Sequence, residues 1–277
     1  MFEAVGSNSI YRAAHGENST EAHMSILEVT NLKKVYTTRF GTNKVEALKN
    51  VNFRVEEGEF VAIMGESGSG KTTLLNILAA LDKPTAGEVL LDGRDFSKLK
   101  EHESATFRRD NLGFVFQDFN LLDTLTLEDN IFLPLVLEGK SYKEMKTLLA
   151  PLASRLGISD ILQKHPYEVS GGQKQRAAVA RAMITNPRLV LADEPTGALD
   201  SKSSDELLAL FREFNGIGQT ILMVTHSVKA ASVASRVMFI RDGVVFHQIY
   251  RGSDTDDMLY RKISDTLTLL TTGSDVE

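Results

Sequence analysis

An eight-residue stretch, Gly65-Glu66-Ser67-Gly68-Ser69-Gly70-Lys71-Thr72, restricts the fold of this chain more than any other feature. It follows the pattern G-x-x-x-x-G-K-T, in which a glycine-rich loop joins a strand to a helix and surrounds phosphate with backbone N–H groups. The flanks agree, because an apolar run at 60–64 precedes the loop as a buried parallel strand would, and 73–81 has helical composition. An ordinary Gly/Ser-rich turn is the alternative, and these flanks make it the weaker interpretation.

The loop predicts two specific side-chain roles. Lys71 is expected to reach the outer phosphates, and the Thr72 hydroxyl is expected to ligate Mg²⁺. The helix that follows directs its positive end at the same anion. The predicted phosphate-binding residues here are Gly65, Ser67, Gly68, Ser69, Gly70, Lys71, Thr72 and Thr73.

A second buried strand, 189–192, ends in two carboxylates, Asp193 and Glu194. A strand can present Asp193 at its carboxyl end to hold Mg²⁺, directly or through water. Glu194 is then placed to orient or deprotonate an attacking water. A strand that ends in solvated acids is the alternative, and the phosphate-binding loop makes it less favourable.

A second anion site is predicted at Ser170-Gly171-Gly172-Gln173, which opens an Arg- and Ala-rich helix. A serine cap and two glycines expose N–H groups at a helix N-terminus, although a plain helix cap would look the same. One nucleotide does not need two such sites from one chain. A second copy of the protein could therefore supply this site to the first copy's nucleotide.

Taken together, these motifs resemble the ATP-binding subunit of ABC transporters. The resemblance covers about residues 26–250, with the motifs in the family's order. The signature begins with Val169, where the family commonly has Leu. The matching pieces are the Walker A loop at 65–72, the Q-loop Gln117, the signature 169–173, the Walker B strand ending at Asp193, the D-loop 198–200 and the H-switch His226.

The resemblance implies ATP and Mg²⁺ as cofactors and further residue roles. Tyr36 would stack on adenine, although an exposed strand tyrosine is the alternative. Gln117 would contact Mg²⁺ and the lytic water, His226 would contact the γ-phosphate, and Asp200 would belong to the nucleotide site of the dimer. Other histidines are more often structural, which is our interpretation of His102, His165 and His247.

Within the family, the stretches 116–126, 192–202 and 239–243 look most like the Bce type, which protects bacteria from bacitracin and similar cell-wall-directed peptides. This resemblance implies an ATP-dependent homodimer at the cytoplasmic face of the bacterial membrane, bound peripherally to a permease. A sensor histidine kinase, reached through the permease, is a further candidate partner. Lipoprotein release, macrolide efflux and cell-division systems remain alternatives within transport. A soluble ABC-type ATPase acting on nucleic acid and a non-hydrolysing regulatory cassette are the rivals outside it.

The predicted fold is α/β, a P-loop NTPase core with an antiparallel β subdomain and an inserted helical subdomain at about 118–185. The ATP-binding domain should span 24–250. A disordered leader or tag is expected at 1–23, and 251–277 forms a C-terminal tail with a loose helix. Locally, we expect a strand from Leu112 to Gln117, a kink or break at Pro151 and a helix over 227–234.

Composition excludes several classes. The net charge of −6 argues against a nucleic-acid partner, and no cysteine is present for disulfides, thiolate catalysis or metal binding. The chain has no run of 18 apolar residues, so we do not expect it to span a membrane. Hydrophobic content of 42% and charged content of 25% are typical of a soluble globular protein.

Overall fold

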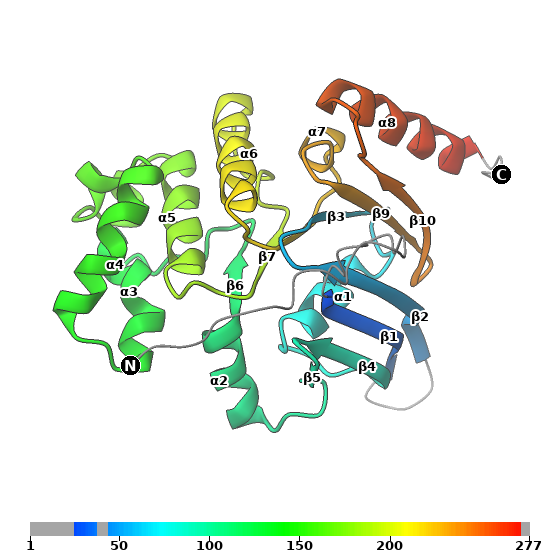
Figure 1. The fold of residues 1–277 in the computed structure, drawn as a ribbon, viewed down its shortest axis with the longest axis horizontal. Coiled ribbons are helices and arrows are strands. Elements are labelled where there is room, and N and C mark those ends of the chain that lie inside the picture. Colours follow the sequence, from blue (N-terminus) through cyan, green and yellow to red (C-terminus); the bar gives the residue numbers. More distant parts are fainter. Residues whose placement is uncertain (1–24, 38–43, 273–277) are drawn as a thin grey trace, which may run out of the picture.

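Two β-sheets face each other across one helix, α1 (Lys71–Leu78), in the computed structural model, which describes residues 25–37 and 44–272 (Figure 1). The predicted leader at 1–23 therefore lies outside the described residues. The smaller sheet has the order β2-β1-β4-β5 and is antiparallel. Its strands are β1 (Ser25–Thr37), β2 (Lys44–Glu56), β4 (Ala86–Leu91) and β5 (Arg94–Asp95).

The larger sheet has six strands in the order β10-β9-β3-β8-β7-β6. All are parallel except β10, which pairs with β9 through the predicted hairpin at Asp242-Gly243, where both residues have positive φ. The strands are β3 (Phe60–Met64), β6 (Leu112–Val115), β7 (Leu189–Asp193), β8 (Ile221–Val224), β9 (Arg236–Arg241) and β10 (Val244–Tyr250).

Both faces of the larger sheet are covered, which explains why its central strands are apolar throughout. In β3, Val61 and Ile63 pack toward α1 and the smaller sheet, whereas Phe60, Ala62 and Met64 pack toward the helices on the opposite face. Those helices include α5 (Gly171–Met183), α6 (Ser201–Gly216), α7 (Val228–Ala231) and α8 (Asp256–Thr272). This arrangement confirms the predicted α/β fold.

A group of helices extends to one side of the larger sheet, beyond β6 (Figure 1). Of these, α3 packs against α5, so the group is joined to the core through the helix that carries the signature residues. Its members are α3 (Leu127–Glu138), α4 (Tyr142–Arg155), η1 (Ser159–Ile161), η2 (Pro166–Glu168) and α5. The remaining helix, α2 (Glu101–Asn111), leads into β6.

Three local predictions were wrong. The strand expected to reach Gln117 ends at Val115, because the Phe116 carbonyl accepts a hydrogen bond from the Gln175 side chain at 3.1 Å instead of continuing the ladder. The helix expected over 227–234 is the short α7, because the chain then turns so that the Ser235 N–H donates to the Phe60 carbonyl of β3 at 2.8 Å.

The third error concerns the break expected at Pro151, since α4 continues through this residue without interruption. Proline removes one N–H from the helix ladder, but Pro151 is exposed, so water can satisfy the carbonyl that loses its partner. The opposite face of α4 buries Met145, Leu149 and Ala153. Tertiary packing therefore holds the helix together against the local preference. The predicted loose helix in the tail is α8, anchored by buried Leu259 and Ile263.

Candidate active site

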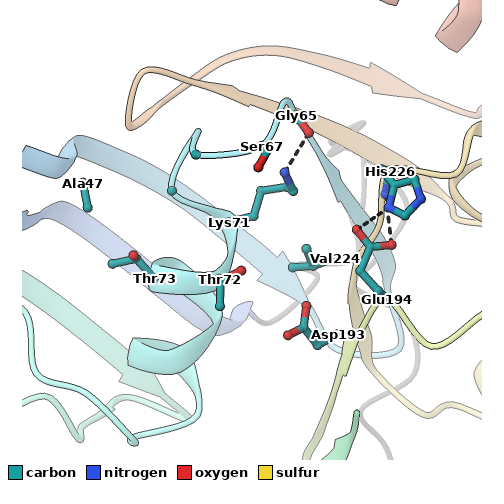
Figure 2. A pocket seen from close by; sticks show the side chains of 12 residues that line it. Ala47, Gly65, Ser67, Lys71, Thr72, Thr73, Asp193, Glu194, Val224 and His226 are labelled. Carbon is teal, nitrogen blue, oxygen red and sulfur yellow. Dashed lines mark hydrogen bonds and ion pairs between the residues drawn. The ribbon is translucent and has the colours of Figure 1, made fainter. Parts of the chain in front are cut away.

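A cavity of about 380 Å³ opens where the carboxyl ends of β3, β7 and β8 meet the start of α1 (Figure 2). This is the edge at which parallel α/β sheets commonly bind ligands. The cavity is lined by Ala47, Gly65, Ser67, Gly68, Gly70, Lys71, Thr72, Thr73, Asp193, Glu194, Val224 and His226. The structure thus brings the Walker A loop, the Walker B carboxylates and the H-switch histidine around one space.

The loop can pack this closely against neighbouring strands only because two positions are glycine. Gly70 has a φ of 104°, and a Cβ there would lie 2.5 Å from the Ala47 carbonyl oxygen. At Gly65, a Cβ would lie 2.2 Å from the Ile240 carbonyl oxygen. Because Gly70 occupies the cap position of α1, it offers no side-chain acceptor to the first N–H groups of the helix. A bound phosphate would suit those N–H groups and the positive end of the helix.

Lys71 lies at the centre of the cavity, where its ammonium group donates to the carbonyl oxygens of Gly65 and Glu66, each at 2.7 Å. Partial burial lowers the pKa of Lys71, while the charges of Glu194, Asp193 and Glu66 act in the opposite direction. The cation is therefore held by two backbone oxygens that phosphate oxygens could replace.

Asp193 and Thr72 both line the cavity and are drawn below Lys71 in the view of Figure 2. Burial, and then the neighbouring charge of Glu194, raise the pKa of Asp193, against the attraction of Lys71. A divalent cation would offset both unfavourable effects. Within the described residues no cluster of three or more His, Cys, Asp and Glu side chains is placed to hold a metal alone. One carboxylate and one hydroxyl fit Mg²⁺, which usually takes its other ligands from substrate phosphates and water.

Glu194 is oriented by His226, which lies two residues beyond the end of β8. Its carboxylate lies 2.9 Å from His226 Nδ1 and accepts the His226 backbone N–H at 3.1 Å. The Glu194 N–H in turn donates to the Val224 carbonyl at 2.9 Å. The side chain of Glu194 is 15% exposed and that of His226 is 73% exposed. The carboxylate is thus fixed beside the cavity, with the histidine on its open side.

Some predicted residues do not line this cavity. The Tyr36 hydroxyl donates to Asp82 at 2.8 Å, with Lys34 Nζ 4.8 Å from the ring centre. Ser69 is a buried residue of the loop, and its hydroxyl has no hydrogen-bond partner among the described residues. Gln117 is exposed and rests against Gly197, where a Cβ would lie 3.1 Å from Gln117 Cδ.

The predicted second anion site also lies outside the cavity lining. Ser170 caps α5, since its hydroxyl accepts the Gln173 N–H at 3.3 Å and its N–H donates to Gln173 Oε1 at 2.9 Å. Gly171 and Gly172 form the first turn. Asp200 caps α6 without this reciprocity, since its carboxylate accepts both the Ser203 N–H and the Ser203 hydroxyl, and these hydrogen bonds lower the pKa of its carboxyl. Both helix starts are complete by themselves within one chain.

Sequence reasoning missed several residues at the site. Ala47 of β2 and Val224 of β8 line the cavity, and nothing in their local sequence distinguishes them from other strand residues. Gln175 and Arg181 of α5 bind the backbone on either side of Gln117. The only available signal was their polarity within an Ala-rich helix.

Comparison with known proteins agrees with this geometry. Residues 48–197, more than half the chain, match the family described as ABC transporter. The chain belongs to the ATP-binding proteins of ABC transporters. It is therefore an ATPase, which binds ATP and forms one subunit of a transporter.

Individual relatives refine the placement of this ABC ATPase. It is 52% identical over 248 residues to the uncharacterized ABC transporter ATP-binding protein YvcR of Bacillus subtilis, covering 89% of this chain and 95% of the relative. It is 49% identical over 244 residues to the bacitracin export ATP-binding protein BceA of Halalkalibacterium halodurans, covering 88% and 96%. The macrolide export ATP-binding/permease protein MacB of Hyphomonas neptunium is 43% identical over 220 residues, 79% of this chain and 34% of the relative.

A solved structure shows the same fold. The dimeric structure of MJ0796, a bacterial ABC transporter cassette, superposes with a TM-score of 0.74 at 41% identity, covering 81% of this chain and 98% of that chain. The same cassette is also known as a dimer in a post-hydrolysis state bound to ADP and Pi. Among the described helices of the ABC ATPase, none combines the length and apolar character that crossing a bilayer requires.

Proposed function

We propose that this ABC ATPase hydrolyses Mg·ATP in the cavity around Lys71, with Glu194 as the base or water-orienting group. The observation that carries the proposal is the Glu194 carboxylate, which follows Asp193 and is held in place by His226 at 2.9 Å. Lys71 and the N–H groups of the loop bind the phosphates. Thr72 and Asp193 hold Mg²⁺, which when bound neutralises charge on the phosphate oxygens.

The chain's own residues then act on water. Glu194 accepts a proton from the water whose oxygen attacks the γ-phosphorus, and the bond from that phosphorus to the β-phosphate oxygen breaks to release ADP. His226 keeps the carboxylate oriented and reaches toward the γ-phosphate. Gln117, which contacts Gly197 in the turn that follows Glu194, would complete the arrangement around Mg²⁺ and water.

Tyr36 is proposed to stack on the adenine. Tyr36 of β1 pairs with Val45 of β2, two residues before Ala47, which lines the cavity. The ring thus stands on the stretch of β-sheet that leads out of the cavity, and it is 41% exposed. Its hydrogen bond to Asp82 would hold the ring edge while the face receives the base.

The nucleotide site is proposed to be completed by a second copy of the chain. Ser170, Gly171, Gly172, Gln173 and Asp200 do not line the cavity of their own chain, yet they form glycine-rich or capped helix starts. In a head-to-tail homodimer the signature helix of one copy faces the γ-phosphate bound by the other. The dimeric assembly of the related cassette MJ0796 supports this arrangement.

Replacing Glu194 tests the chemistry. Glu194→Gln keeps the size and the hydrogen bond from His226 but removes the proton acceptor, so turnover should fall by about a hundred- to a thousandfold. ATP binding should stay near wild type, and ATP should drive this variant into dimers. Glu66→Gln removes an exposed carboxylate whose charge also acts on Lys71, and it serves as the matched control. Near-normal hydrolysis by Glu194→Gln would reject the role of Glu194.

For the transporter, we propose a Bce-type permease as the partner, with resistance to cell-wall-directed peptides such as bacitracin as its task. Support comes from the identity to BceA and from the sequence texture at 116–126 and 192–202. The ATPase would then work peripherally at the cytoplasmic face of the bacterial membrane, with a sensor histidine kinase as a further partner through the permease. Macrolide efflux is the second candidate, because MacB is also a relative.

Gene deletion separates these tasks. Loss of the gene should sensitise cells to bacitracin and lantibiotics while leaving macrolide sensitivity unchanged, and a plasmid copy carrying Glu194→Gln should not restore resistance. A defect confined to macrolides, lipoprotein sorting or division would reassign the substrate while leaving the ATPase intact.

A further inference from the structure

Gln175 of α5 joins two segments that flank the proposed catalytic residues. Its side chain is fully buried, and Nε2 donates to the Phe116 carbonyl at 3.1 Å and to the Pro195 carbonyl at 2.7 Å. Phe116 directly precedes Gln117, and Pro195 directly follows Glu194. One amide group therefore fixes the position of both segments relative to the signature helix.

Core packing alone does not explain an amide at this position. Gln175 Oε1 is buried with no partner among the described residues, which is unfavourable for stability. A hydrophobic side chain of similar length would fill the space without burying that oxygen. The two donated hydrogen bonds are thus the structural role of Gln175, and both end on backbone beyond the last residues of β6 and β7.

Arg181, six residues further along α5, holds the other side of the Gln117 loop. Its guanidinium donates to the Phe119 carbonyl at 2.9 Å and to the Asn120 carbonyl at 2.5 Å. Phe119 and Asn120 have φ values of 62° and 49°, in the left-handed region, which asparagine tolerates but a bulky residue such as phenylalanine rarely adopts. Arg181 therefore stabilises an uncommon turn immediately after Gln117.

The two catalytic segments also contact each other. The Gln117 side chain rests on Gly197, and the Gly197 N–H donates to the Glu194 carbonyl at 2.9 Å. The turn from Glu194 to Gly197, the Gln117 loop and α5 thus form one hydrogen-bonded unit, in which the Gln175 side chain donates to both of the other parts.

We infer that Gln175 is a positioning residue for ATP hydrolysis, which keeps Gln117 and Glu194 in register with the signature helix. When a partner's nucleotide engages the start of α5, the movement of α5 reaches the Glu194 segment through Gln175, and it reaches the Gln117 loop through Gln175 together with Arg181. The inference rests on the proposed roles of Glu194 and Gln117. It predicts that Gln175 affects turnover in the closed dimer and has little effect on ATP binding.

The test compares Gln175→Leu with Gln219→Leu. Gln219 makes two similar bonds, from Nε2 to the Pro187 and Thr220 carbonyls, each at 3.1 Å, but at the opposite ends of β7 and β8. Gln175→Leu should lower kcat by about ten- to a hundredfold, because a small displacement of catalytic groups is costly, while the Kd for ATP changes less than about twofold. Gln219→Leu should lower the melting temperature about as much as Gln175→Leu does, but it should leave kcat unchanged.

Two further variants keep the test decisive. Gln175→Asn retains the amide but is too short to reach both carbonyls, so its kcat should lie between those of wild type and Gln175→Leu. If Gln175→Leu folds poorly, Gln175→Asn alone should still have a kcat below wild type. Glu194→Gln is measured in parallel. If Glu194→Gln loses turnover while folded Gln175→Leu or Gln175→Asn keeps wild-type kcat, the positioning role is overturned and the proposed function survives. If Glu194→Gln keeps turnover, the proposed function itself fails.

Discussion

The starts of α1 and α5 are both glycine-rich helix N-termini, but α1 has no side-chain cap whereas α5 has a complete one. At α1, Gly70 provides no cap and Lys71 occupies a cavity shared with two carboxylates. At α5, Ser170 and Gln173 satisfy the helix start reciprocally, and neither residue lines the cavity around Lys71. The first is arranged to bind an anion within its own chain, whereas the second is a stable cap that needs a partner to become a site.

The largest difference is expected in ATP binding and hydrolysis when one residue at the start of each helix is replaced. Lys71→Ala should weaken ATP binding and lower hydrolysis by about a hundredfold or more, because it removes the cation at the phosphates. Ser170→Ala should lower hydrolysis by about tenfold or more, but ATP binding by the monomer should change less than about twofold. Phosphate release and titration of a fluorescent ATP analogue measure the two quantities.

Ser141→Ala is the matched control for this comparison. Ser141 caps α4 with the same reciprocal pattern through Glu144, so its loss should cost a similar free energy of unfolding, about 1 kcal/mol. Hydrolysis should remain normal, since α4 is not proposed to face a nucleotide. Equal loss of hydrolysis in Ser141→Ala and Ser170→Ala would contradict the proposal that the start of α5 contacts a partner's nucleotide.

A smaller, structural difference is expected between the glycines. Gly70→Ala combines a φ of 104° with a contact of 2.5 Å to backbone, so it should lower the free energy of unfolding by about 2 kcal/mol or more. Gly171→Ala meets nothing closer than 3.7 Å and should stay within about 0.5 kcal/mol. Chemical denaturation of the nucleotide-free protein measures both, and similar values would show that the two loops are equally constrained.

The smallest effect concerns the charge of Asp193, which ends β7 and lines the cavity at the start of α1. Because the folded protein raises the pKa of Asp193 above its ordinary value of 3.8, this group's contribution to stability falls as pH rises through the folded pKa. Asp193→Asn should therefore stabilise the nucleotide-free protein at neutral pH, by less than about 1 kcal/mol, and the gain should shrink on acidification.

Removing charge at the start of α6 should have the opposite sign. Asp200→Asn lacks the ionised group whose pKa the Ser203 hydrogen bonds lower, so it should be destabilised above the ordinary carboxyl pKa. Thermal melts across pH 3–8 without nucleotide compare the two variants. Destabilisation by Asp193→Asn at neutral pH would contradict the view that the ionised Asp193 carboxylate is unfavourable in the folded protein without a bound cation.

Much of the site was predictable because its signals are local. The loop at 65–72, the carboxylates after the strand at 189–192 and the cap at Ser170 each depend on residues within a few positions of one another. Other features depend on distant neighbours. Pro151 stays helical because α4 packs on its far face, and the strand expected at 112–117 stops where Gln175 takes the Phe116 carbonyl.

The sequence by itself determined the fold class, the phosphate-binding loop and the chemical types of the groups around it, because glycine conformations, caps and strand-end carboxylates are set by neighbouring residues. Only the tertiary structure decided which of these groups share a cavity. His226 meets Glu194 across 32 residues of chain, and Gln175 reaches Phe116 across 59. Such pairings arise from the order of strands in the sheet and the packing of α5 beside it, and neither is written in any local pattern.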